Sequence, residues 1–266
     1  MAMNPAPRRL ASTAGQSEEL PRMSLIEHLE ELRRRIFWCL ACVAIALFPC
    51  WAYVQEIFSF MQRPILAALP AGKHLAYTGL VDPFMLYFKV AALAAVFISS
   101  PFILYQLWGF ISPGLYRRER LFVLPFVTLG SLFFITGGAF GYYVVFPYAV
   151  RVLLGFGKGL DPVITIERYF SFLMAVILGL GLMFELPIAI FILCQVGIVT
   201  PRFLMRHFRW AIMIIFLIAA IVTPTPDAFN VCLFALPTLL LYLLGVGAAA
   251  LASWMRVRSA AKQAAS

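Results

Sequence analysis

The sequence predicts an all-α protein that crosses a membrane six times, with both ends on the cytoplasmic side. Of its 266 residues, 63% are hydrophobic and only 12% are charged, whereas soluble domains have roughly 45–50% and about 25%. The apolar residues form stretches close to the roughly 20 residues that a helix needs to cross the hydrocarbon core. Helices satisfy all of their own backbone groups in lipid, so stretches of this length favour membrane helices.

We expect one membrane domain over residues 23–254, between a disordered cytoplasmic tail at 1–22 and a second cytoplasmic tail at 255–266. The fifth apolar stretch rises only about 20 Å as a helix, which is less than the roughly 30 Å core. Two prolines between the last two stretches predict a tight reversal, so these spans form a hairpin. The six expected spans are 36–54, 85–110, 121–148, 169–199, 210–222 and 228–251.

The distribution of Lys and Arg predicts the orientation. Fifteen of the 21 lie in segments 8–35, 117–120, 202–209 and 256–262, which six spans place on one side of the membrane. Positive charge is retained on the cytoplasmic side, so both termini are expected there. The net charge of +9 is explained by this placement, and a nucleic-acid interface, which would need one basic face, is not indicated.

Segment 24–35, SLIEHLEELRRR, predicts an amphipathic helix that leads into the first span. Leucines and isoleucine recur with helical period on one face. On the other face, Glu30 with Arg34 and Glu31 with Arg35 have the i,i+4 spacing of helical ion pairs. The sequence leaves two readings of these acids open: ordinary surface pairs, or a carboxylate cluster with a function at the inner membrane surface.

Other charged residues stand apart from this helix. Glu119 lies among three arginines in the loop after the second span, where it is expected to be a solvated loop charge. Glu185 lies deep in the fourth span next to Pro187, and such a group costs roughly 2.5–3.5 kcal/mol in a membrane. We therefore expect Glu185 to face protein or water, either as a functional polar site or as a protonated acid bonded to a neighbouring helix. Lys89 and Asp227 are near outer span ends, where snorkelling or capping explains them.

No motif indicates an enzyme, a metal site or a cofactor. The three histidines share no ligand spacing, and no phosphate-binding glycine loop occurs. An intramembrane hydrolase would need a base near Ser131 or Ser171, and no histidine lies inside a span. A small proton-coupled transporter using Glu185 and Lys89 is an alternative, but the paired broken helices of such proteins are not found. A scaffold for other membrane proteins is the remaining alternative.

Four segments, in this order along the chain, resemble the TatC family, the signal-peptide receptor subunit of the twin-arginine protein translocase. The first two motifs are highly specific, and the resemblance runs from about residue 24 to about residue 251. The segments are SLIEHLEELRRR (24–35), SSPFILYQLWGFISPGLYRRER (99–120), FELPIAIFILC (184–194) and TPTPDAF (223–229).

The resemblance implies a fold and a function. The fold is a cupped six-helix bundle in the bacterial cytoplasmic membrane. The function is to bind paired-arginine signal peptides of folded precursors and to assemble with single-span TatA-like and TatB-like subunits. Export is then driven by the proton gradient, and self-association of the chain is expected.

The resemblance also assigns site residues. Two carboxylates on separate inner segments would each accept one guanidinium, which presents a fork of donors matched to a carboxylate. Some family members carry a glutamine four residues after the acidic residue of the last helix, where this chain has Val231. The implied roles are signal-peptide binding by Glu31, Glu119, Arg33 and Phe110, an intramembrane polar site at Glu185, and structural or partner contacts at Pro64, Lys89 and Asp227.

Overall fold

The structure is a computed structural model, and it describes residues 25–67, 75–111, 123–157, 163–223 and 227–264. Within these ranges the chain is mainly helical, with short turns and loops and one isolated β-bridge between Ala76 and Thr165. The expected tail at 1–22 lies outside the described residues. The all-α fold class predicted from the sequence is confirmed.

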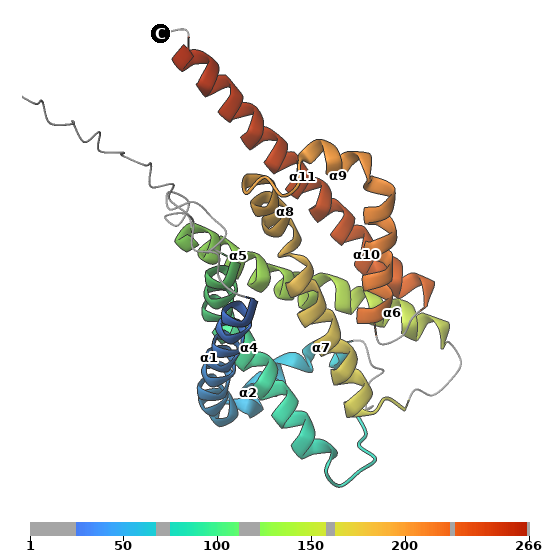
Figure 1. The fold of residues 1–266 in the computed structure, drawn as a ribbon. Helices are drawn as coiled ribbons and strands as arrows, with labels where there is room; N and C mark the ends of the chain where they lie inside the picture. Colours follow the sequence, from blue (N-terminus) through green and yellow to red (C-terminus); the bar gives the residue numbers. More distant parts are fainter. Residues whose placement is uncertain (1–24, 68–74, 112–122, 158–162, 224–226, 265–266) are drawn as a thin grey trace, which may run out of the picture.

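Five helical stretches of the described chain are long and apolar enough to cross a membrane, and a sixth is shorter. The shorter one, α10, has 15 residues, which corresponds to about 22 Å. Figure 1 shows α10 beside α11, whose carboxyl-terminal part projects beyond the rest of the bundle. The helices are α1 (Leu25–Ala52), α2 (Val54–Met61), α3 (Arg63–Leu66), α4 (Asp82–Ile111), α5 (Val123–Phe140), the π-helical η3 (Gly141–Val145), α6 (Phe146–Phe156), α7 (Ile166–Met183), α8 (Leu186–Gln195), α9 (Pro201–Arg206), α10 (Phe208–Val222) and α11 (Ala228–Ala264).

Several helices extend beyond the apolar stretches into the polar residues that flank them. The amphipathic segment and the first expected span are one helix, α1. The third expected span runs through α5, η3 and α6, because the π-helical turn continues the helix rather than ending it. Helix α11 continues to Ala264, through most of the segment expected to be a tail.

Helix α7 is the centre of the core. Phe170, Leu173, Val176 and Leu180, which follow each other at helical spacing on α7, are fully buried. Helix α5 packs closely along it because a Cβ at Gly137 would lie only 2.6 Å from the backbone oxygen of Leu180. Small residues allow such close approach of helix backbones in membranes.

The remaining helices pack in pairs around this centre. Helix α1 lies along α4, and α8 lies along α11 (Figure 1). Most of α1 faces outward, since only 6% of its apolar window is buried. This exposure fits a helix whose outer face contacts lipid.

Two connecting segments at the end of the bundle remote from Glu31 are joined to each other. The Ala76 N–H donates to the Ile164 oxygen at 3.0 Å, and the Ile166 N–H donates to the Ala76 oxygen at 2.8 Å. Two tyrosines also anchor the end of α2: the Tyr142 hydroxyl donates to the Phe60 oxygen and the Tyr169 hydroxyl donates to the Met61 oxygen. These bonds fix α2 and α3 against the long helices.

Candidate functional site

Glu31 lies near the start of α1, yet its carboxylate is mostly covered. The Glu31 side chain is 12% exposed, and that of Arg35, one turn later, is 21% exposed. Arg35 donates from Nε at 3.0 Å and from Nη2 at 2.5 Å, and both bonds go to Glu31 Oε1. The Glu31–Arg35 ion pair expected from the i,i+4 spacing is confirmed.

Arg35 also joins α1 to α4. Its Nη1 donates to the backbone oxygen and to the side-chain Oε1 of Gln106, each at 3.2 Å. Gly109 follows one turn later in α4, and a Cβ at that position would overlap the Arg35 guanidinium. The absence of a side chain at Gly109 therefore makes space for Arg35 between the two helices.

The second carboxylate oxygen of Glu31 has different surroundings. Glu31 Oε2 is buried and has no hydrogen-bond partner among the described residues. A buried acceptor without a partner costs about 1–3 kcal/mol, so an incoming N–H donor would be favoured there. Arg35 thus orients the Glu31 carboxylate through one oxygen, and the other oxygen can still accept a hydrogen bond.

Two other expected signal-binding residues take different positions. The Phe110 ring, at the end of α4, stacks on His28 of α1, with ring centroids 4.3 Å apart. Arg33 is exposed, and its guanidinium lies 5.7 Å from the centroid of the Phe37 ring. Phe110 therefore belongs to the α1–α4 contact that holds Glu31, whereas Arg33 lies against α1 itself. Glu119 is outside the described residues.

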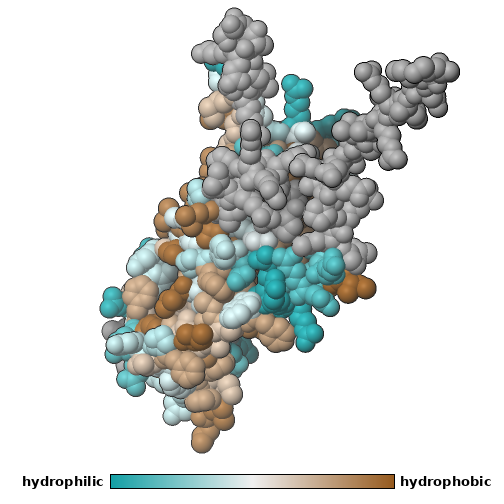
Figure 2. Space-filling model, turned by 60° about the vertical axis from the view of Figure 1, so that its left-hand side comes forward, coloured by the Kyte–Doolittle hydropathy of each residue, from teal (hydrophilic) through white to brown (hydrophobic). Residues whose placement is uncertain are grey.

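The first turns of α1 carry several exposed charged side chains. Glu27, Glu30, Arg33 and Arg34 are all exposed. Figure 2 shows a hydrophilic area right of centre that borders pale and hydrophobic surface. A charged area next to an apolar belt is typical of the membrane surface.

Glu185 lies at the break between α7 and α8. Pro187 has no N–H to donate to the Met183 carbonyl, so the helix is interrupted there. The side chain points toward α5, because a Cβ at Gly130 would lie 3.1 Å from Glu185 Oε2. Glu185 Oε1 is buried without a partner among the described residues. The carboxyl group therefore faces protein, as the sequence predicts.

The last three expected site residues lie in or next to α3, α4 and α11. Asp227 precedes α11 and accepts hydrogen bonds from the Asn230 N–H at 2.9 Å and from Asn230 Nδ2 at 2.7 Å. Lys89 is exposed on α4, and Pro64 is half-buried in the first turn of α3. Asp227 thus acts as a helix cap.

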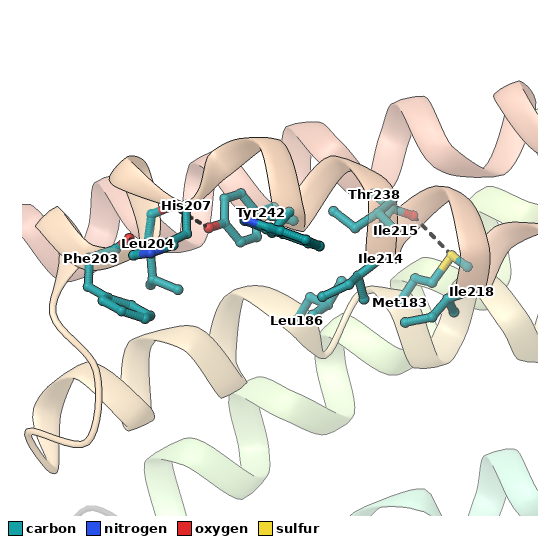
Figure 3. A pocket seen from close by; sticks show the side chains of 12 residues that line it. Met183, Leu186, Phe203, Leu204, His207, Ile214, Ile215, Ile218, Thr238 and Tyr242 are labelled. Atoms are coloured by element: carbon teal, nitrogen blue, oxygen red, sulfur yellow. Dashed lines mark hydrogen bonds between the residues drawn. The ribbon is translucent and has the colours of Figure 1, made fainter.

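An apolar groove of about 400 Å³ runs beside α10 (Figure 3). Helices α8, α9, α10 and α11 supply most of its walls, together with Met183 at the end of α7. Two hydroxyls in it are already bonded, since Thr238 donates to the sulfur of Met183 at 2.9 Å and Tyr242 donates to the Leu204 oxygen at 3.0 Å. The groove therefore offers mainly apolar contact. No three His, Cys, Asp or Glu side chains of the described ranges lie together as metal ligands would.

The family model for the Sec-independent protein translocase protein TatC matches residues 27–237. The chain belongs to the TatC family. The match includes α1 with Glu31, the α1–α4 contact and the Glu185 break, and it confirms the resemblance carried by the four sequence motifs.

Relatives support the same assignment for this TatC-family chain. A TatC protein of Koribacter versatilis is 48% identical over 235 residues, which cover 87% of each chain. A TatC protein of Desulforapulum autotrophicum is 35% identical over 227 residues, covering 85% of this chain and 84% of the relative. The crystal structure of a twin-arginine translocase receptor, TatC, has a TM-score of 0.76 and 32% identity, with 85% of this chain and 100% of that chain covered. The shared architecture is that of a polytopic helical membrane protein.

The structure places three further residues around Glu31 that were not predicted from the sequence. Gln106 accepts hydrogen bonds from Arg35, and Gly109 leaves space for its guanidinium. His28 stacks on Phe110. Gln106 and Gly109 lie in the QLWGF part of the second motif, so the motif contained this signal. His28 lies one turn before Glu31 and Leu32, a spacing that places it near the same helix face.

Proposed function

We propose that this protein is the receptor and core subunit of a twin-arginine translocase in the bacterial inner membrane. It binds paired-arginine signal peptides of folded precursors, and Glu31 accepts one of the two guanidinium groups. Glu119 accepts the other from the neighbouring inner loop. Both termini are cytoplasmic in this proposal, so that the site meets precursors before their export.

The observation that carries the proposal is the half-satisfied carboxylate of Glu31. Arg35 bonds only Oε1, while the buried Oε2 has no partner among the described residues. A guanidinium donates from a rigid planar fork that lysine lacks, so a site built on carboxylates prefers arginine. Arg35 keeps Glu31 oriented and partly neutralised before the cargo arrives.

The apolar groove beside α10 supports the partner assignment. Single-span TatA-like and TatB-like subunits present an apolar helix, and the groove offers an apolar wall along a helix shorter than the membrane core. A partner helix laid there would cover the exposed side chains of Ile214 and Ile218. Assembly with such partners then precedes transport driven by the proton gradient.

Binding of a twin-arginine signal peptide to the full chain in detergent tests the receptor assignment. Glu31→Gln removes one charge-assisted hydrogen-bond acceptor, worth about 1.5–3 kcal/mol, so binding weakens about 10- to 150-fold. Glu31→Lys weakens it further by repulsion of the arginines. The matched control is Glu30→Gln, because Glu30 is exposed on the same helix.

The control variant and a twin-lysine peptide complete the experiment. Glu30→Gln should bind the twin-arginine peptide within about twofold of wild type, and the wild-type chain should bind the twin-lysine peptide weakly. Unchanged binding by Glu31→Gln would contradict the proposed role of Glu31. Equal weakening by Glu30→Gln would instead indicate a diffuse charge effect.

A further inference from the structure

A second cavity lies at the end of the bundle opposite Glu31. It has a volume of about 400 Å³ and opens between the α2–α3 corner and the η3–α6 segment. Its lining includes two arginines, Arg63 of α3 and Arg151 of α6, and no acidic residue among the described part of the chain. Both arginines are exposed. This concentration of positive charge is unexpected at the end of the bundle where the positive-inside rule predicts few cations.

The aromatic residues of the cavity hold Arg63 in place. The Arg63 guanidinium lies 5.6 Å from the centroid of the Phe60 ring, within the range of a cation–π contact. Phe60 itself stacks on Tyr142 with centroids 4.6 Å apart, and the Tyr142 hydroxyl donates to the Phe60 oxygen at 2.5 Å. The wall that carries Arg63 is therefore ordered before any ligand binds, which reduces the entropy lost on binding.

The depth of the cavity in the membrane follows from helix length. The membrane-length stretch that contains η3 begins at Leu124, and an untilted helix rises about 27 Å from there to Tyr142 and about 40 Å to Arg151. The hydrocarbon core is roughly 30 Å thick, and the headgroup regions extend the bilayer to about 40–45 Å. Membrane helices tilt by up to about 40°, which shortens these rises to about 21 and 31 Å, so Arg151 lies at or beyond the edge of the core, where the lipid headgroups begin.

We propose that this cavity binds the headgroup of an anionic phospholipid of the phosphatidylglycerol type. The phosphodiester oxygens accept hydrogen bonds from Arg63 and Arg151, whose planar forks match phosphate geometry. Pro64 and Pro147 give the cavity an apolar side, along which the glycerol and the start of an acyl chain lie. A lipid is favoured over free phosphate because the site combines cations with apolar walls at the membrane surface.

Native mass spectrometry of the full chain in detergent tests the proposal. The probes are phosphatidylglycerol and phosphatidylcholine with identical acyl chains. The double variant Arg63→Gln/Arg151→Gln is compared with Arg168→Gln/Arg206→Gln, which removes the same charge from exposed positions outside the cavity. A third variant, Arg63→Lys/Arg151→Lys, keeps the charge and removes the forks.

The proposal requires one tightly held phosphatidylglycerol per wild-type chain. Its apparent affinity falls about tenfold or more in the Gln double variant, falls less in the Lys double variant, and is unchanged in the control. Phosphatidylcholine binds more weakly to the wild type because its headgroup has no net charge.

Three results would overturn the proposal. Equal phosphatidylglycerol retention by wild type and by both double variants at the two arginines would show that the cavity holds no lipid headgroup. Displacement of the lipid by millimolar inorganic phosphate would assign the site to a free anion. Displacement by a soluble acidic peptide, but not by inorganic phosphate, would assign it to an acidic segment of a protein partner.

Discussion

The Glu31–Arg35 pair differs from an ordinary surface ion pair because Arg35 is shared between two helices. An exposed i,i+4 pair contributes about 0.3–0.5 kcal/mol. Here the guanidinium also donates twice to Gln106 of α4, and both partners of the pair are largely covered. Arg35 is therefore a positioning residue, which holds the carboxylate of Glu31 and the end of α4 in one arrangement.

Substitution of Gly109 by alanine tests this arrangement. The new Cβ would overlap the guanidinium of Arg35, and because that group is the far end of a flexible side chain, it moves rather than the backbone. The hydrogen bonds to Gln106 are then lost, at about 0.5–1.5 kcal/mol each. We expect a lower thermal midpoint of the solubilised protein and weaker binding of a twin-arginine peptide.

The control for this change is Gly155→Ala, since a Cβ at Gly155 meets nothing within 4 Å. Both glycines are helical, so the gain in helix propensity is shared. Gln106→Ala removes the same contact between Arg35 and α4 and leaves the Glu31–Arg35 pair in place, so adding it to Gly109→Ala should cause little further loss. Additive losses would show that Gly109 does not act through the contact between Arg35 and Gln106.

Glu185 is the second residue whose environment sets its role. Glu185 Oε1 is buried without a described partner, and the carboxyl group faces the interior of the bundle. We expect it to form a hydrogen bond there with a polar group of a partner helix or of the inserted signal peptide. Interhelical hydrogen bonds in membranes are worth about 1–2 kcal/mol, so Glu185→Leu should slow transport about 5- to 30-fold in vesicles containing the whole translocase. Peptide binding at Glu31 should remain unchanged, and Glu185→Gln should retain most transport. Normal transport by Glu185→Leu would remove this role.

The contact of α8 with α11 shows how one glycine permits an interface between elements. A Cβ at Gly245 would lie 2.8 Å from Pro187 Cα and 3.2 Å from the Pro187 oxygen. These are backbone atoms, so a larger residue at this position separates the two helices instead of moving a side chain.

Gly245→Ala should therefore destabilise the protein by about 1–3 kcal/mol, as overpacking does in other cores. Gly247, two residues later on the same helix, has nothing within 4 Å of its added Cβ, and Gly247→Ala should be neutral or slightly stabilising. Thermal unfolding of the two detergent-solubilised variants gives the comparison. Equal midpoints would show that the close approach of α8 to α11 contributes nothing.

At the level of elements, apolarity predicts where helices lie better than where they end or break. The apolar stretch at 169–199 is continuous in hydropathy, but Pro187 removes a backbone donor and divides it into α7 and α8. Helix α11 continues to Ala264 because helix hydrogen bonding does not require an apolar sequence. The site shows the same limit. Spacing on one helix predicts the Glu31–Arg35 pair, whereas the bonds to Gln106 depend on how α1 packs against α4, which no local pattern encodes.

At the scale of the whole molecule, the packing around α7 determines how the spans are arranged but not which side faces the cytoplasm. The orientation is a prediction from the charge distribution, and single cysteines test it in a chain whose five native cysteines are replaced. Leu80→Cys, at a position 98% exposed before α4, should react with a membrane-impermeant maleimide from outside the cytoplasmic membrane. Arg258→Cys, exposed near the end of α11, should react only after permeabilisation. The reverse pattern would contradict the orientation.

The backbone bridge between Ala76 and Ile164–Ile166 restrains two connecting segments relative to each other. It joins the chain just before α4 to the chain just before α7, so it acts as a pivot for these two helices. Rotation about a pivot displaces the far end of each lever arm most. The far end of α4 carries Gln106 and Gly109, which contact Arg35. A small change in the angle of α4 therefore displaces these two residues most, and it would alter the hydrogen bonds by which Arg35 positions Glu31.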